Sequence, residues 1–180
     1  MSTHAVPQLN PALESIFARR SVRRYRAGEI SPNLLDDLLT AGMAAPSAVA
    51  RDPWHFIVLR RQDRLQGLAG CLPHGQMLHQ AAAAIVVCGE LARAHDGLES
   101  YLLQDLSAAT ENILLAASLL GLGACWLGIH PRPERIEAVS RLCALPKGII
   151  PVSGIALGWP EQAPQPRTRY RAECVHDEQW

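Results

Sequence analysis

The sequence has few aromatic residues, no excess of either charge and no long apolar run. Aromatic residues make up 5% of the 180 residues, so Leu, Ile, Val and Ala must supply most of the core. The 17 basic residues balance 17 acidic ones, whereas a nucleic-acid-binding protein normally carries a basic excess. No run of about 18 uncharged apolar residues occurs, so no membrane-spanning helix is expected. These absences favour a soluble globular protein with neither a nucleic-acid nor a membrane partner.

The five cysteines are scattered, odd in number and lack any C-x-x-C pair. This pattern favours free thiols in a reducing compartment, so we expect a cytoplasmic protein. The first residues show no basic start followed by an apolar stretch, and no signal peptide is expected. Cys71, His74 and His79 lack a fourth ligand and a metal-binding spacing, so we expect loop residues there and no metal.

Helix signals recur along the chain. Asn10-Pro11 and Ser31-Pro32 each combine a capping side chain with a proline at the first helical position. Further helices are predicted around Arg64–Ala69, over Ser100–Leu120 and from Pro133 to Leu142. Strands are predicted over Trp54–Leu59, Ala83–Cys88, Ala124–Ile129 and Ile149–Leu157.

This mixture predicts a single α/β or α+β domain over residues 1–180, with a buried sheet. Residues 161–180 lack any helical or strand period and are predicted to form an extended arm. Because the arm carries Val175 and Trp180, it needs a surface to lie on, which a partner subunit would supply.

Five arginines lie within the eight residues from Arg19 to Arg26, RRSVRRYR. The planar guanidinium suits bidentate binding of phosphate, and the Ser21 hydroxyl adds a neutral donor. A solvated basic turn or a nucleic-acid patch would have the same composition. On spacing alone, the solvated turn is favoured.

Three other segments stand out. Residues 45–56, APSAVARDPWHF, form a loop stiffened by Pro46 and Pro53 that leads into a strand. In residues 121–128, GLGACWLG, Gly128 permits a close approach of the backbone to a ligand or marks a bulge. Residues 166–169, PRTR, contain two more arginines. A solvated arm would explain them equally well as a binding segment.

Taken in order, the four segments resemble the nitroreductase family of FMN enzymes. RRSVR at residues 19–23 is similar to the family's R-R-S-x-R, and APS followed by Pro53-Trp54 is similar to its A-P-S-x-x-N-x-Q-P-W loop. Residues 112–128, NILLAASLLGLGACWLG, are similar to the family's N-x-L-L-A-A…G-L-G-x-C-W-I-G. The resemblance extends over essentially the whole chain and implies an α+β fold with a central mixed β-sheet flanked by helices.

The resemblance implies a homodimer with two FMN sites at the subunit interface, each built from both chains. The residues it assigns to FMN are Arg19, Arg20, Ser21, Arg23, Pro46, Ser47, Ala48, Trp126, Leu127, Gly128, Arg167 and Arg169.

The phosphate end of the cofactor would contact both ends of the chain. Arg19 and Ser21 would meet the FMN phosphate, with Arg167 and Arg169 approaching from the arm. Arg20 would lie near the ribityl chain.

The ring would contact three other segments. Arg23 would face the pyrimidine edge, where its charge would stabilise the anionic reduced flavin. Pro46, Ser47 and Ala48 would come from the partner subunit and lie along the isoalloxazine. The backbone of residues 126–128 would supply amides near N5 and O4.

The implied activity is ping-pong transfer of hydride from NADH or NADPH through flavin N5 to a small electron-poor acceptor: a nitroaromatic, quinone or activated alkene. No protein group is expected to act as the acid, because the flavin carries the electrons. The same fold also permits dehalogenation, desaturation or flavin breakdown, and non-catalytic FMN binding stays open.

Two departures from the family pattern affect the ring environment. The loop asparagine of the family is Ala50 here and its glutamine is Asp52, so Arg51 or Asp52 would have to replace the missing polar partner. The stretch from Trp54 to Tyr101 is also short for the family, which predicts a reduced helical excursion over the substrate channel.

Overall fold

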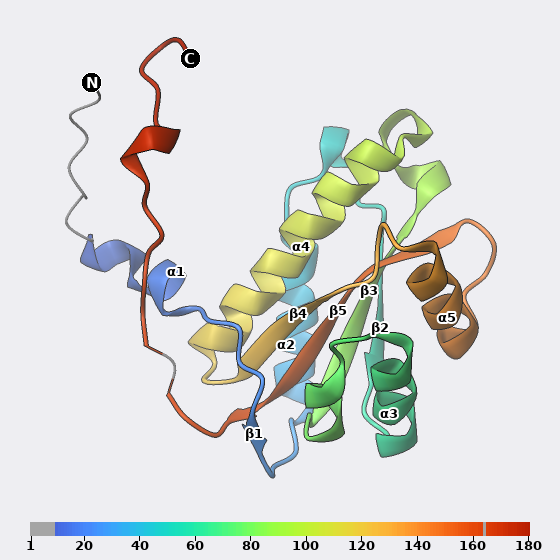
Figure 1. The fold of residues 1–180 in the computed structure, drawn as a ribbon. Helices are drawn as coiled ribbons and strands as arrows, with labels where there is room; N and C mark the ends of the chain where they lie inside the picture. The colour runs from blue at the N-terminus through green and yellow to red at the C-terminus, as the bar shows by residue number, and fades with distance from the viewer. Residues whose placement is uncertain (1–9, 164) are drawn as a thin grey trace.

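The computed structural model describes residues 10–163 and 165–180 and is built around one five-stranded sheet (Figure 1). The strands are β1 (Tyr25–Arg26), β2 (Trp54–Leu59), β3 (Ala83–Glu90), β4 (Gly123–Gly128) and β5 (Ile149–Pro160). The helices are α1 (Glu14–Ala18), α2 (Pro32–Met43), α3 (Gln62–Cys71), α4 (Glu99–Leu119) and α5 (Pro133–Cys143). The first nine residues, where no signal peptide is expected, lie outside the described part.

All neighbouring strands of the sheet are antiparallel, so the expectation of a mixed sheet is wrong in this respect. β3 and β4 run in the same direction and are joined through α4, as in a parallel crossover. However, β5 pairs with β3 along one edge and with β4 and β1 along the other, so β5 separates β3 from β4. The parallel pairing that remains is an isolated bridge between Ser21 and Ala124.

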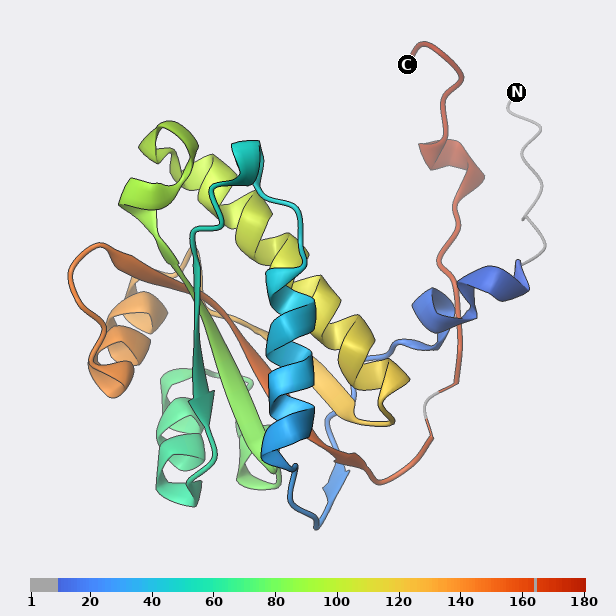
Figure 2. The same cartoon turned by 180° about the vertical axis from the view of Figure 1, so that it is seen from behind.

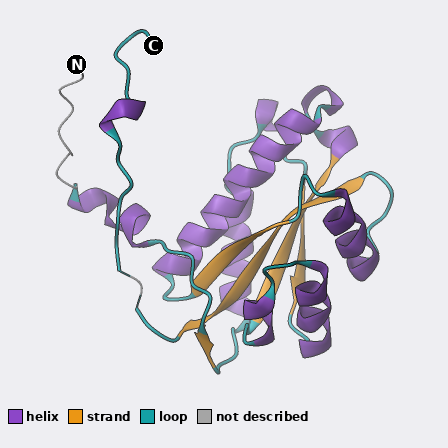
Figure 3. Ribbon diagram, viewed as in Figure 1, coloured by secondary structure: helices purple, strands orange, loops and turns teal. Residues whose placement is uncertain are grey.

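Helices cover both faces of the sheet, which gives three layers (Figure 3). Alternate residues of β3 divide between the two cores, because successive side chains of a strand point to opposite faces. Ile85 and Val87 pack with α2 and α4 around Leu38 and Leu106. On the other face Val86 belongs to a second cluster with α3 and α5. Seven of the eight β3 residues are buried, which explains their continuous apolar run.

The predicted helix starts are confirmed where a side chain caps the first turn. The Asn10 side chain accepts a hydrogen bond from Ala12 N at 3.0 Å, and Ser31 Oγ accepts from Leu34 N at 3.3 Å. Pro133 begins α5 as expected. No helix in the described residues is long and apolar enough to cross a bilayer.

The two ends of the described chain lie side by side and project away from the sheet (Figure 2). Arg167 N donates a hydrogen bond to Phe17 O at 3.2 Å, which ties the C-terminal segment to α1. Beyond it, the segment has one short 3-10 turn, Ala172–Cys174, and is otherwise irregular. Its predicted contact with a partner subunit stays a prediction.

Gly158 of β5 lets Tyr25 of β1 lie directly over the strand. A Cβ atom at position 158 would come within 2.6 Å of Tyr25 Cγ, so Gly158→Ala should displace the ring. We expect the free energy of unfolding in urea to fall by about 1–3 kcal/mol, as for other overpacked cores.

Gly70→Ala is the matched control, because Gly70 lies in α3 and a Cβ there meets nothing within 4 Å. It should raise the free energy of unfolding by about 0.5–1 kcal/mol, since alanine is the better helix former. An equal effect of both substitutions would contradict the close approach of Tyr25.

Candidate functional site

The arginine-rich segment is fixed to the edge of the sheet rather than left as a solvated turn. Val22 N donates to Ala124 O at 2.9 Å, next to the bridge between Ser21 and Ala124. The Tyr25 hydroxyl donates to Val22 O at 2.7 Å. Backbone bonds therefore hold residues 21–25 against β4 and β5.

The structure brings the first three residues of this segment together with two from the far end of the chain. Arg19, Arg20, Ser21, Arg167 and Arg169 line one pocket of about 350 Å³. The hydrogen bond between Arg167 N and Phe17 O holds the C-terminal side of this pocket in place. The pairing expected from the sequence is therefore present within a single chain.

Positive charge is concentrated in this pocket, which we call the cationic pocket. Desolvation and then the charges of Arg167, Arg169 and Arg19 lower the pKa of Arg20, because each disfavours a further cation. Arg19 Nε lies 3.0 Å from Oε1 of Glu111 in α4. This is the one ion pair that the pocket arginines make among the described residues. Four guanidiniums facing one carboxylate favour an anionic ligand with several acceptor oxygens.

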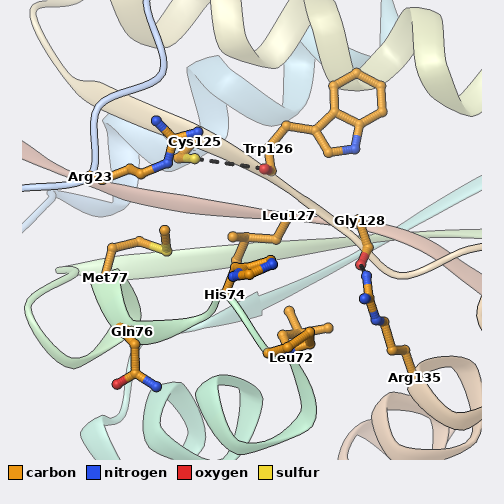
Figure 4. Close-up of a pocket in the computed structure, with 11 residues that line it drawn as sticks. Arg23, Leu72, His74, Gln76, Met77, Cys125, Trp126, Leu127, Gly128 and Arg135 are labelled. Carbon is orange, nitrogen blue, oxygen red and sulfur yellow. Dashed lines mark hydrogen bonds between the residues drawn. The ribbon is translucent and has the colours of Figure 1, made fainter.

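A second pocket, of about 490 Å³, lies along β4 (Figure 4). It brings together four of the residues assigned to the flavin ring. These are Arg23, Trp126, Leu127 and Gly128. Its other wall comes from the end of α3, the turn that follows and α5. Those residues are Leu72, Pro73, His74, Gln76, Met77 and Arg135, and Cys125 of β4 completes the lining.

The backbone at the end of β4 is open to this pocket. A Cβ atom added at Gly128 would meet only Arg135 Nη1, at 4.0 Å. Arg135 donates from Nη1 to Gly128 O at 2.9 Å, so the strand end is held while its surface stays accessible. The Trp126 side chain points away from His74 and Gln76 and is 37% exposed (Figure 4). A planar ligand could therefore lie against the backbone of residues 126–128.

Pro46, Ser47 and Ala48 line neither of these pockets. They follow α2 at the other side of α4, where Ala48 N donates to the buried Asp105 Oδ1 at 2.8 Å. Their assignment to the site of a second copy stays a prediction.

Asp52 is used inside the loop, although its position is that of the family glutamine. Ser47 Oγ donates to Asp52 Oδ1 at 2.6 Å and accepts from Asp52 N at 3.0 Å. The backbone of this loop enters the left-handed region, which residues other than glycine rarely adopt. The φ values are 49° at Val49, 53° at Ala50 and 47° at Asp52. Arg51, in contrast, is exposed and makes no ion pair with another described residue, so whether it takes the place of the asparagine stays a prediction.

Comparison with known proteins adds an independent line of evidence. The model of the nitroreductase family matches residues 16–72 and 69–159. The chain belongs to the nitroreductase family. It is 41% identical, over 93% of its length and 87% of the relative's, to the Methanothermobacter thermautotrophicus protein named "Putative NADH dehydrogenase/NAD(P)H nitroreductase".

Two solved nitroreductase-family structures are similar to the whole fold. One, of the same name from Parabacteroides distasonis, superimposes with a TM-score of 0.89 at 39% identity, covering 96% of this chain and 100% of the other. The second, from Desulfovibrio desulfuricans, is described as a "putative nitroreductase in complex with fmn". It has a TM-score of 0.80 at 34% identity, covering 96% and 99%.

Several residues of the β4 pocket lie outside the family motifs and were missed from the sequence. His74 was expected to be an ordinary loop residue, and Gln76, Met77 and Arg135 carried no signal at all. Their positions depend on how α3 and α5 pack on the sheet, which no local pattern encodes. Among the described residues no group of His, Cys, Asp or Glu is arranged to hold a metal ion.

Asp105 should fix the strained loop of residues 46–52. It is 4% exposed, Ala48 N donates to its Oδ1, and its Oδ2 has no hydrogen-bond partner among the described residues. Asp105→Ala would leave Ala48 N–H unpaired, and we expect a loss of about 1–3 kcal/mol in the free energy of unfolding.

Asp105→Asn is the matched variant, because it retains an acceptor oxygen for Ala48 N–H. It should lose less stability than Asp105→Ala in urea titrations. Hydrogen exchange at Ala48 should quicken only in the alanine variant, and unchanged exchange in both would contradict the assigned role.

Proposed function

We propose that this chain is an FMN-dependent oxidoreductase that passes electrons from NADH or NADPH to a small electron-poor acceptor. The observation that carries the proposal is the position of residues 19–23 between two pockets. Arg19, Arg20 and Ser21 line the cationic pocket, while Arg23 lines the pocket along β4. This one short segment therefore lines both the cationic pocket and the pocket along β4.

The residues present fit the phosphate end of FMN. Arg19, Ser21, Arg167 and Arg169 would bind the phosphate, and Arg20 would lie beside the ribityl chain. The charges of Arg167, Arg169 and Arg19 contribute, after desolvation, to the lowered pKa of Arg20, and a bound phosphate would reduce this repulsion.

The pocket along β4 fits the ring. The accessible backbone of residues 126–128 would provide amide donors, and Arg23 would hold a positive charge at the pyrimidine edge, favouring the reduced, negatively charged cofactor. When bound, FMN would supply the redox chemistry by accepting hydride at N5 and transferring two electrons to the acceptor. The similar Desulfovibrio protein solved with FMN supports this choice of cofactor.

We further propose that the active form is a homodimer whose sites use Pro46, Ser47 and Ala48 of the second copy. α1 has no buried residue, and its Ile16 is 53% exposed. Trp180 at the end of the C-terminal arm is fully exposed in the single chain. Such apolar groups on projecting segments are typical of a surface covered by another subunit.

The proposal predicts a yellow dimer with reductase activity. After incubation with FMN and removal of free cofactor, light scattering should give twice the chain mass of 19.6 kDa, with one flavin per chain by absorbance. NADH or NADPH should be oxidised rapidly only when a quinone is present. Initial rates should give parallel double-reciprocal lines, because donor and acceptor occupy the same pocket in turn. Protein that stays colourless after FMN addition would overturn the proposal.

Arg19 and Arg26 should differ in their effect on FMN affinity. Arg19→Ala removes a charged donor from the cationic pocket and should weaken FMN binding about 10- to 100-fold, the equivalent of one charge-assisted hydrogen bond. Arg26 lines neither pocket, and its guanidinium lies 5.4 Å from the centre of the Trp159 ring. Arg26→Ala should therefore leave the Kd within about twofold, as followed by quenching of FMN fluorescence. Equal weakening by both substitutions would show that the assignment is wrong.

A further inference from the structure

A third pocket contains none of the twelve residues assigned to FMN. It has a volume of about 530 Å³, within the range of small-molecule sites, and lies between two loops. Ala50 and Arg51 line it on one side, and Arg93, Asp96 and Gly97 line it on the other.

The charge of this loop pocket is positive. Arg51 and Arg93 are both exposed, and neither makes an ion pair within the part of the chain that the structure describes. The one acidic group in the lining is Asp96, whose Oδ2 lies 3.5 Å from His95 Nε2. Two unpaired guanidiniums outweigh one carboxylate and favour an anion with several acceptor oxygens.

Both walls of the loop pocket are held in unusual backbone conformations. Ala50 has a φ of 53° and Asp96 a φ of 53°, and each lies in the left-handed region. Such residues cluster at ligand-binding segments, because the surrounding structure must keep them in place. The hydrogen bond from Ala48 N to Asp105 Oδ1 keeps one of the two loops in place. Arg51 therefore lies on a preformed loop.

The loop pocket lies at the end of the sheet where β4 ends. His130 lies two residues after Gly128, and its Nε2 is 3.0 Å from Oε1 of Glu99. Glu99 follows the loop that contains Arg93 and Asp96. Glu90 N donates to Pro53 O at 2.8 Å, which joins the ends of the two loops. The loop pocket and the pocket along β4 therefore lie toward the same end of the sheet.

We propose that the loop pocket binds the 2′-phosphate of NADPH, an inference that rests on the proposed function. A phosphate monoester carries a charge of about −1.5 to −2 near pH 7 and can pair with two guanidiniums. The chain lacks the G-x-G-x-x-G fingerprint that binds dinucleotides elsewhere, so the donor's phosphates need another cationic surface. Arg51 and Arg93 provide one, and they make NADPH the preferred donor.

Three variants test this assignment on the FMN-loaded protein. Arg93→Ala should raise KM for NADPH about tenfold and KM for NADH less than twofold. Asp96→Asn removes the opposing charge, keeps a residue that tolerates the left-handed region, and should lower KM for NADPH. Arg60→Ala removes an exposed arginine outside the loop pocket and should change neither constant.

A binding measurement separates this inference from the proposed function. Adenosine 2′,5′-bisphosphate should bind to the wild-type protein in calorimetry, and Arg93→Ala should abolish its binding, whereas 5′-AMP should bind to neither. Equal effects of Arg93→Ala on NADPH and NADH would overturn the 2′-phosphate assignment and favour the pyrophosphate instead. No effect on either donor, in an enzyme that retains flavin and activity, would exclude the loop pocket as a donor site. A protein without flavin would refute the proposed function, while the bisphosphate measurement would still decide the loop pocket.

Discussion

Three of the other four strands hydrogen-bond to β5, and the positions of the arginine segment and of the end of β4 depend on that pairing. β3 occupies one edge of β5, while β4 and β1 share the other. The strand lies between two apolar cores, and its buried Ser153 hydroxyl lies 3.0 Å from Thr110 Oγ1 of α4, so its one buried polar side chain is satisfied. With β4 fixed in this way, the bridge to Ser21 places the arginine segment, and the end of β4 places Gly128.

The cationic pocket has an electrostatic cost that the rest of the chain must offset. Folding brings Arg167 and Arg169 next to Arg19 and Arg20, although like charges at short range repel. The ion pair with Glu111 reduces this repulsion, and a bound anion would remove more of it. Because a ligand that binds only the folded state stabilises that state, FMN and the docking of the C-terminal arm should be thermodynamically coupled.

The sequence predicted most of the elements, because their signals are local. Ser31-Pro32 and Pro133 mark helix starts, and the boundaries of β2 agree with its aromatic and β-branched composition. The insertion of β5 between β3 and β4 was not predicted, since strand order depends on contacts between distant residues. Family resemblance, rather than spacing, drew Arg19 and Arg167 together. It did not indicate Arg93 or His74, which enter pockets only through the packing of loops and helices, nor the role of Asp105 beneath the loop.

The central position of β5 also has a consequence for synthesis, because residues 149–160 follow the other four strands in the chain. While they are still in the ribosome, β3 has a partner only in β2, and β4 has none among the named strands. A nascent chain therefore exposes unpaired strand edges, which favour association with other chains. Residues 167–169 emerge later still, so the cationic pocket is completed after the sheet. A product truncated before residue 149 would lack both the middle of its sheet and half of its anion site.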